Sequence, residues 1–178
     1  ADITKADLSV SGATAANKVY DATNTASVTG GSVTALQSDV VSLSTANATF
    51  ADKNVGAAKA ITTAYTLTGT DAGNYNLIQQ SGLTANITAK AITASGITAS
   101  NKVYDAGVVA TLDTSVAQIA GGATGDADNK YYTGDALTLV TSAATGAFAD
   151  KTVGTGKAVT VSGLSLSGAD SGNYTISD

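Results

Sequence analysis

The segment GDADNKYYTGD, residues 125–135, holds the densest group of side chains that could do chemistry. Its carboxylates, Asp126, Asp128 and Asp135, offer the hard oxygen ligands that Ca²⁺ prefers. The segment lacks the spacing and the terminal glutamate of an EF-hand loop, and it lacks the glycine period of nonapeptide calcium repeats. We therefore interpret it first as a solvated polar loop and keep calcium, the one cofactor considered, as the alternative.

The same segment contains the aromatic pair Tyr131 and Tyr132. An exposed tyrosine on a loop can contact a sugar or a protein surface through its amphipathic ring. Since neighbouring side chains in an extended segment point to opposite sides, one of the two is expected to pack inward. The pair is a candidate ligand-binding site, and a longer hairpin that binds nothing is the alternative.

Catalytic chemistry has few side chains to draw on. The chain has no His, no Cys, no Glu and no Arg, so the usual groups that activate or orient a nucleophile are missing. A Ser-Lys arrangement is conceivable, but no segment points to one. We expect no enzyme activity.

The overall charge and hydropathy exclude two classes of partner. The net charge is −5 and only nine residues are cationic, whereas nucleic-acid binding needs clustered cations on the phosphates. No apolar run approaches the roughly 20 residues that a membrane-spanning helix requires. We expect neither nucleic-acid binding nor membrane insertion.

The chain is a tandem duplication, because three blocks recur in the same order. They are NKVYDA at 17–22 and 101–106, FADK at 50–53 and 148–151, and Asp-x-Gly-Asn-Tyr at 71–75 and 170–174. We assign a first module to residues 1–89 and a second to 90–178. Residues 1–4 match the last strand of a module, TANIT at 84–88, which the second module lacks, and the second module has a longer loop at 107–147.

Short apolar alternations, Thr and Val enrichment, and turn residues at regular spacing predict about six or seven strands in each module. The predicted fold is all-β, with two immunoglobulin-like β-sandwich modules; β-grasp-like modules with one short helix each are the alternative. Finer expectations are a helical turn at 34–38, a β-bulge at Ser162-Gly163 that absorbs one extra residue, and Asx-turns at Asp21 and Asp105. The short junction at 89–91 predicts semi-rigid modules joined end to end.

The recurring tyrosines are interpreted as structural. The phrases around Tyr75 and Tyr174, which begin at Asp71 and Asp170, are similar to the tyrosine corner of immunoglobulin domains, where the hydroxyl bonds backbone a few residues upstream. Tyr20 and Tyr104 are likewise expected to pack at the core or its rim, because so few large apolar residues are present.

The blocks NKVYDA, FADKNVG, LTGTDAGNY and ANITAKAIT resemble the YDG-type repeat, related to the MBG modules, of large secreted bacterial surface proteins. Members usually have Tyr-Asp-Gly where this chain has Ala22 and Ala106. The resemblance implies an extracellular location at a bacterial cell surface, often in filamentous-haemagglutinin-like exoproteins that serve adhesion and biofilms. It carries over no catalytic residues.

Three functions follow from this interpretation. The first is a structural stalk or spacer of an adhesin or matrix protein, whose partners are neighbouring modules of the same chain. The second is binding of a host or matrix glycan or protein by the loop of the second module. The third is a self-assembling surface fibre or surface-layer subunit joined by donated strands. The lysines that recur in both copies, Lys18, Lys53, Lys102 and Lys151, suit either packing of their stems at turns or an isopeptide crosslink.

Overall fold

The computed structural model describes residues 1–44 and 47–177. Asp178, the last residue of the second predicted module, lies outside the described residues. The chain forms two compact units. Unit 1 comprises Ala1–Val19 with Thr23–Thr88, and unit 2 comprises Tyr20–Ala22 with Ala89–Asp178. The last three residues of the first NKVYDA block thus belong to unit 2.

Almost all regular structure in the described residues is β-strand, which confirms the all-β prediction. Within residues 1–44 and 47–177, the helical elements are two single 3₁₀ turns, η1 (Ala72–Asn74) and η2 (Ser171–Asn173), which lead directly into strands. The immunoglobulin-like sandwich stays a prediction.

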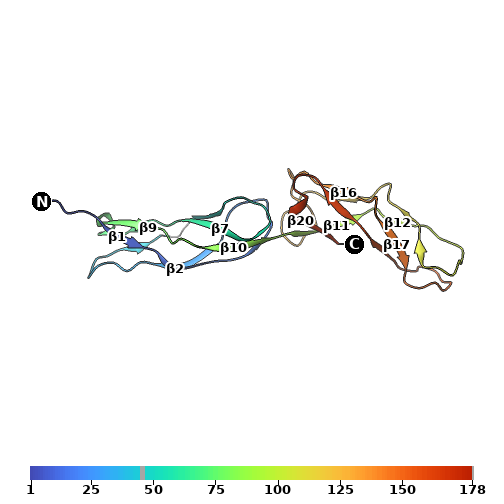
Figure 1. Cartoon of the computed structure of the whole chain (residues 1–178), viewed down its shortest axis with the longest axis horizontal. Coiled ribbons are helices and arrows are strands. Elements are labelled where there is room, and N and C mark those ends of the chain that lie inside the picture. Colours follow the sequence, from blue (N-terminus) through green and yellow to red (C-terminus); the bar gives the residue numbers. More distant parts are fainter. Residues whose placement is uncertain (45–46, 178) are drawn as a thin grey trace. The chain divides into compact units, whose positions relative to one another are not determined.

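Among its described residues, unit 1 has ten strands, of which Figure 1 labels β1, β2, β7, β9 and β10. They are β1 (Ala6–Ser9), β2 (Ser11–Ala15), β3 (Lys18–Val19), β4 (Val28–Ser32), β5 (Ser42–Leu43), β6 (Asn47–Phe50), β7 (Gly56–Ala64), β8 (Leu67–Thr68), β9 (Tyr75–Ile78) and β10 (Thr84–Thr88). The largest sheet has the order β3-β10-β7-β6, so β10 lies between β3 and β7. The remaining pairs are β1 with β9, β2 with β4, and β5 with β8. The predicted strand at 84–88 is confirmed as β10.

Unit 2 also has ten strands among its described residues. They are β11 (Lys90–Ser95), β12 (Thr98–Ala99), β13 (Val109–Ala110), β14 (Leu112–Asp113), β15 (Gln118–Ile119), β16 (Thr138–Val140), β17 (Thr145–Phe148), β18 (Val159–Ser162), β19 (Ser165–Ser167) and β20 (Tyr174–Ser177). Three-stranded sheets have the orders β15-β11-β20 and β13-β17-β18, and the two-stranded pairs are β12 with β14 and β16 with β19.

The duplication is visible in strand pairing as well as in sequence. In unit 1, β1 runs parallel to β9 and places Leu8 opposite Leu77. In unit 2, β11 runs parallel to β20 and places Ile92 opposite Ile176. Because register decides which side chains face the core, the equal register means that both repeats build their interior in the same way.

The interior of each unit is small and depends on few large side chains. In unit 1 the most completely buried ones are Phe50 and Ile87, and in unit 2 they are Tyr20, Ile92 and the polar Lys90. Aromatic side chains bury the most area per residue, so a core with so few aliphatic residues depends strongly on each tyrosine and phenylalanine.

Two of the finer predictions need correction. The apolar alternation around Ser162-Gly163 is not one bulged strand: β18 ends at Ser162, Gly163 has φ +83°, and β19 pairs with a different strand, β16. The extra residue lies in the segment that links two sheets. The alternation of inward- and outward-facing side chains does not have to continue through such a segment. At 34–38 the chain forms a hydrogen-bonded turn, Asp39 N to Leu36 O, and no helix.

None of the helices in the described residues is long and apolar enough to cross a membrane.

Candidate functional site

The candidate site in unit 2 is centred on the hydrogen bond between Tyr174 and Asp135. Strand β20 begins at Tyr174, which is buried against β11. Its hydroxyl donates to Asp135 Oδ2 over 2.6 Å and accepts from the Tyr132 backbone N–H over 3.0 Å. Burial and the hydrogen bond to Asp135 raise the pKa of the Tyr174 hydroxyl well above its usual value. The hydroxyl is therefore neutral and fixes the loop that precedes β16.

Tyr20 completes this aromatic site. Its side chain is fully buried, and its hydroxyl donates to the same oxygen, Asp135 Oδ2, over 2.8 Å. The Tyr20 ring stands edge-on to the rings of Tyr174 and Tyr132, with centroids 5.3 Å and 6.1 Å apart. Such T-shaped pairs are favourable beyond the area they bury. We call Tyr20, Tyr132, Asp135 and Tyr174 the tyrosine socket of unit 2.

An ion pair between a buried lysine and a partly exposed aspartate holds the neighbouring loop. Lys90, the first residue of β11, is fully buried, and its ammonium lies 2.9 Å from Asp128 Oδ1 and 5.6 Å from the centroid of the Tyr132 ring. Asp128 also accepts backbone N–H groups of the same turn, from Thr124, Gly125 and Lys130. The Lys90 ammonium, aided by these donors, holds the pKa of Asp128 well below its usual range.

The structure thus places the predicted calcium and ligand residues in different surroundings. Asp128 and Asp135 accept internal hydrogen bonds, while Asp126 is exposed. Tyr132 is half-buried in the socket, and its neighbour Tyr131 is half-buried beside Gly121. Within residues 1–44 and 47–177, no three acidic side chains gather in a way that could hold a metal ion. Chemically, this cluster is arranged to fasten the loop to the core.

Unit 1 contains the same tyrosine arrangement. The Tyr75 hydroxyl donates to Asp39 Oδ2 over 2.7 Å and accepts from the Leu36 N–H over 3.0 Å. The hydrogen bond to Asp39 raises the pKa of Tyr75. The partners lie 36 and 39 residues upstream, so the expected tyrosine corner, with its bond a few residues away, is wrong for both repeats. The bond is long-range and ties a loop to a strand.

The predicted aspartates Asp71 and Asp170 bind the residue that directly follows the loop aspartate in each repeat. Asp71 Oδ2 accepts the Val40 N–H over 2.8 Å, and Asp170 Oδ2 accepts the Ala136 N–H over 2.9 Å. Sequence reasoning missed Asp39, and it missed the structural use of Asp135 and Lys90. A usable signal was present, because Asp39 and Asp135 each precede the strand, β5 or β16, that was itself predicted.

The second NKVYDA block lies in a different environment from the first. Tyr104 is 56% exposed and Val103 is 88% exposed, whereas Tyr20 is fully buried. The loop itself is ordered by an ion pair of Lys102 with Asp105 and by the Gly107 N–H bond to Asp105 Oδ1, which confirms the Asx-turn there. Identical residues are thus buried in one place and presented to solvent in the other.

The lysine of each NKVYDA block lies beside the phenylalanine of the FADK block. Lys18 Nζ is 5.6 Å from the centroid of Phe50, and Lys102 Nζ is 5.6 Å from the centroid of Phe148. Cation–π contacts of this kind stabilise by about 0.5–1 kcal/mol at exposed sites. The recurrence of these lysines therefore has a structural cause, and the isopeptide crosslink stays a hypothesis.

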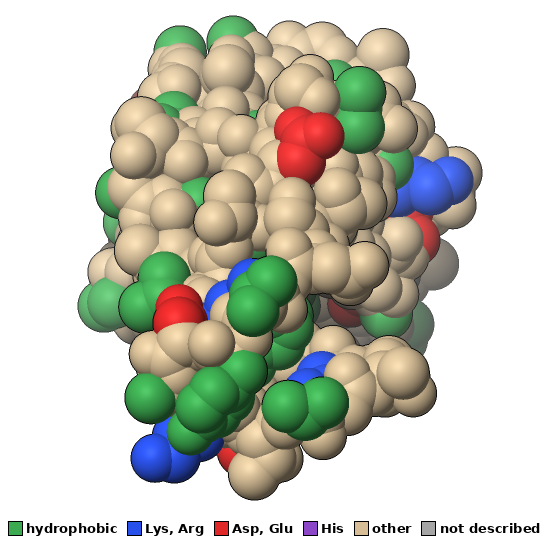
Figure 2. Space-filling view, turned by 90° about the vertical axis from the view of Figure 1, so that its right-hand side faces the viewer, with side chains coloured by type: hydrophobic (Ala, Val, Ile, Leu, Met, Phe, Trp, Pro, Cys, Tyr) green, Lys and Arg blue, Asp and Glu red, His purple; other side chains and the backbone are tan. Residues whose placement is uncertain are grey.

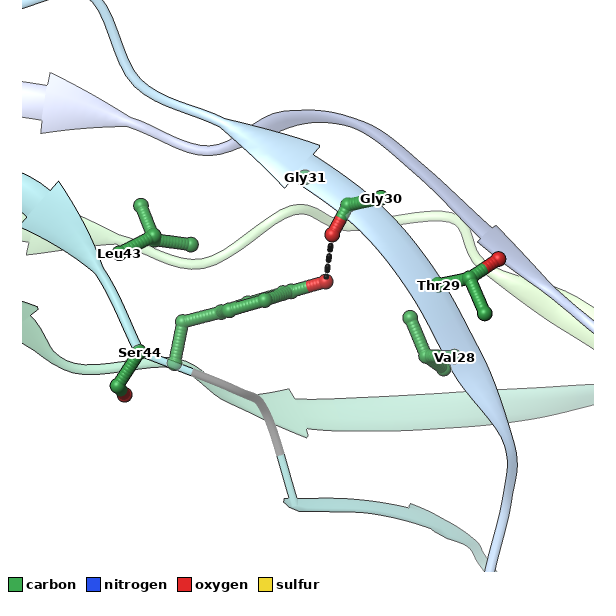
Figure 3. Close-up of a pocket in the computed structure, with 7 residues that line it drawn as sticks. Val28, Thr29, Gly30, Gly31, Leu43 and Ser44 are labelled. Carbon is green, nitrogen blue, oxygen red and sulfur yellow. Dashed lines mark hydrogen bonds between the residues drawn. The ribbon is translucent and has the colours of Figure 1, made fainter.

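A separate hollow of about 380 Å³ lies in unit 1 (Figure 3). Tyr65 lines it and donates its hydroxyl to the Gly30 carbonyl over 3.0 Å. A Cβ on Gly31 would lie 2.7 Å from that hydroxyl oxygen, so glycine at this position is what lets the ring approach the backbone. The polar atom of the tyrosine is used internally, and we assign no ligand to this hollow.

Equal strand register and equal tyrosine–aspartate bonds in two successive units define an all-β tandem-repeat protein. The family comparison identifies which one: the YDG domain model matches residues 4–83 and again residues 88–178, and the chain belongs to the YDG domain family. No curated protein and no solved structure matches the chain.

Proposed function

We propose that the two repeats are a spacer in the stalk of a bacterial cell-surface adhesin or extracellular matrix protein, and that they project a distal binding region. The observation that carries the proposal is the use of the recurring motif residues. In both repeats the tyrosine hydroxyl and its aspartate are used for internal fastening. A motif that is repeated to build a scaffold, not to handle a substrate, suits a mechanical role.

Membership of the YDG domain family supports this proposal. The resemblance of the motifs to repeats of large secreted surface proteins favours an extracellular location. Repetition suits a spacer, since each additional unit with its own core adds length without new chemistry. Binding of a glycan or protein through Tyr131 and Tyr132 is the less favoured alternative, because Tyr132 packs in the socket against Tyr20.

The test measures how far the repeats hold a tag from the cell surface. Zero, one or two copies of the whole chain are placed between a surface anchor and a peptide tag on a bacterial cell. The height of the tag above the membrane is then measured by fluorescence. The proposal expects the height to rise in steps with copy number, and a Tyr131→Ser variant serves as the matched control for ligand binding. An unchanged height, or capture of a glycan by the purified chain that Tyr131→Ser abolishes, would contradict a spacer function.

A further inference from the structure

Charged side chains at the surface contribute little to holding these units together. Figure 2 shows a face on which backbone and uncharged polar side chains predominate and charged side chains are scattered. Only 13% of the residues in the chain are charged, and exposed ion pairs add little stability. Resistance of the fold to an applied load therefore comes from the strand ladders and from buried contacts.

The strand pair β1 and β9 has the geometry that resists pulling along the chain. The two strands run parallel over four residue pairs, and Ala6 is opposite Tyr75 at the start of the ladder. Tension along the chain reaches β1 at its first residue. It reaches β9 at its last residue, because only β10 follows β9 before the chain leaves unit 1. In a parallel pair these two points lie at opposite ends of the ladder, so tension slides one strand past the other. The hydrogen bonds run between the strands, and all of them are then loaded together.

This ladder is shielded from water on its inner side. Leu8 in the middle of β1 and Tyr75 at the start of β9 are both buried. The N–H of Val10, which is also buried, extends the pairing by donating to the Ile78 carbonyl over 2.9 Å. Backbone hydrogen bonds that are covered in this way open less readily than solvent-exposed ones, which slows the rupture of the pair.

Two consecutive glutamines hold the end of β9 at which the load arrives. The Gln79 side chain donates an N–H to the Tyr65 carbonyl over 2.9 Å, and its Oε1 accepts the Tyr65 N–H over 2.9 Å. Gln80 forms the same two bonds with Ala13 of β2, over 3.0 Å and 2.8 Å. Each side-chain amide thus makes the pair of bonds that a residue of a neighbouring strand makes. We call Gln79 and Gln80 the glutamine clamp.

The last strand of unit 1 is held before the load reaches the glutamine clamp. β10 lies between β3 and β7, and it runs parallel to β3. Its residue Ile87 is fully buried. Figure 1 shows β1 and β10 lying lengthwise in unit 1, with the start of β1 toward one end of the unit and the end of β10 toward the other. A pull on the two ends of unit 1 therefore acts along the strands.

We propose that unit 1 is a load-bearing element, in which the parallel pair β1–β9 and the glutamine clamp resist tension along the chain. The same pairing recurs in unit 2, where β11 runs parallel to β20 over four residue pairs. The inference deepens the spacer function and rests on it, since a stalk whose distal region is bound is pulled along its length. It adds that the repeats are built to stay folded under that pull.

The first test changes the direction of the pull in the same folded chain. The chain has no cysteine, so pairs of introduced cysteines define where the handles of optical tweezers are attached. Lys5→Cys with Ala89→Cys pulls unit 1 along its strands, whereas Lys5→Cys with Gly73→Cys separates β1 and β9 from one end. These positions suit handles, because Lys5 is exposed and a Cβ at Gly73 meets nothing within 4 Å.

Forced unfolding is governed by the unfolding rate, so the readout is the lifetime of unit 1 at one constant force. The lifetime should be at least about tenfold longer for the pull from residues 5 and 89, because several ladder bonds must break together and not one at a time. Equal lifetimes in the two geometries, or a shorter one along the strands, would overturn the inference. The spacer proposal would stand, since the height of its tag is measured without load.

The second test removes half of the glutamine clamp. Gln80→Leu keeps a side chain of similar size and deletes both bonds to Ala13. It should shorten the lifetime under the pull from residues 5 and 89 by about tenfold. The matched control Gln37→Leu replaces an exposed glutamine of the same unit and should leave the lifetime unchanged.

Circular dichroism before each pull establishes that the variant is folded. If Gln80→Leu does not fold, Gln80→Glu takes its place, because it keeps the Oε1 acceptor and loses only the donor at neutral pH; it should shorten the lifetime by a smaller factor. A lifetime in the Gln80 variant equal to that of Gln37→Leu would refute the role of the glutamine clamp.

Discussion

The substitution Ala106→Gly should stabilise unit 2. Ala106 follows Tyr104-Asp105 and has φ +61°, in the left-handed region that glycine adopts without strain. An alanine there costs about 1–2 kcal/mol. Glycine removes that cost but gains about 0.4–1 kcal/mol of conformational freedom in the unfolded chain. The side chain is exposed and packs against little, so the net gain in the free energy of unfolding is about 0.5–1 kcal/mol.

Calorimetry or thermal circular dichroism measures this gain as a rise in the melting temperature of unit 2. For a unit of this size, about 1 kcal/mol corresponds to roughly 4–8 °C, so we expect a rise of about 2–8 °C. The converse variant Gly156→Ala, at φ +60° with nothing within 4 Å of the new Cβ, should lower the same transition by a similar amount.

The matched control is Ala127→Gly, an exposed turn alanine in the same unit whose φ is not positive. It should lose about 0.4–1 kcal/mol, because only the unfolded chain gains freedom. If Ala106→Gly lowers the melting temperature of unit 2 as Ala127→Gly does, the left-handed backbone at Ala106 does not destabilise the unit and the reasoning is refuted.

Two further predictions concern the tyrosine socket and its ion pair. Tyr174→Phe removes the donor to Asp135 and the acceptor of the Tyr132 N–H. Urea titration should therefore show that the free energy of unfolding of unit 2 falls by about 1–3 kcal/mol. The control is Tyr104→Phe at an exposed site, and a loss in Tyr174→Phe no larger than in this control would contradict the prediction. Asp128→Asn tests how the stability of unit 2 depends on pH. Lys90 lowers the pKa of Asp128 in the folded state. The carboxylate therefore stabilises the fold above the pKa of about 4 that an aspartate has in the unfolded chain, and this stabilisation is lost as pH falls below that value. The stability difference between the unmodified chain and Asp128→Asn should therefore shrink between pH 7 and pH 3, with Asp2→Asn as control, and an equal difference at both pH values would exclude the ion pair as its cause.

The features that the sequence predicted correctly are those with a local physical cause. The strand at 84–88 has apolar residues at every second position, and the turn at Asp105 needs only an aspartate two residues before a free N–H. The duplication itself required only the comparison of the chain with itself. The all-β composition follows from Thr, Val and Gly preferences that act residue by residue.

The features that were missed depend on partners far away along the chain. Lys90 stands at the start of a strand, where a lysine is normally solvated, and it is buried because Asp128 comes from the insertion of the second repeat. Tyr20 and Tyr104 lie in identical hexapeptides, so no local pattern could separate the buried from the exposed one. The prediction of a tyrosine corner rested only on a similar short sequence motif. The observed partner of the Tyr75 hydroxyl is Asp39, which lies in the loop before β5, a loop whose length differs between the repeats.

The borders of the compact unit and of the duplicated segment do not coincide in this chain. The family match begins its second segment at residue 88, but the compact unit that contains this segment also includes Tyr20–Ala22. A fragment excised at the sequence boundary would lose a fully buried aromatic ring and would leave Tyr132 and Tyr174 facing solvent. Measurements on isolated repeats of this type will therefore understate their stability unless the fragment begins upstream of the preceding Tyr-Asp motif.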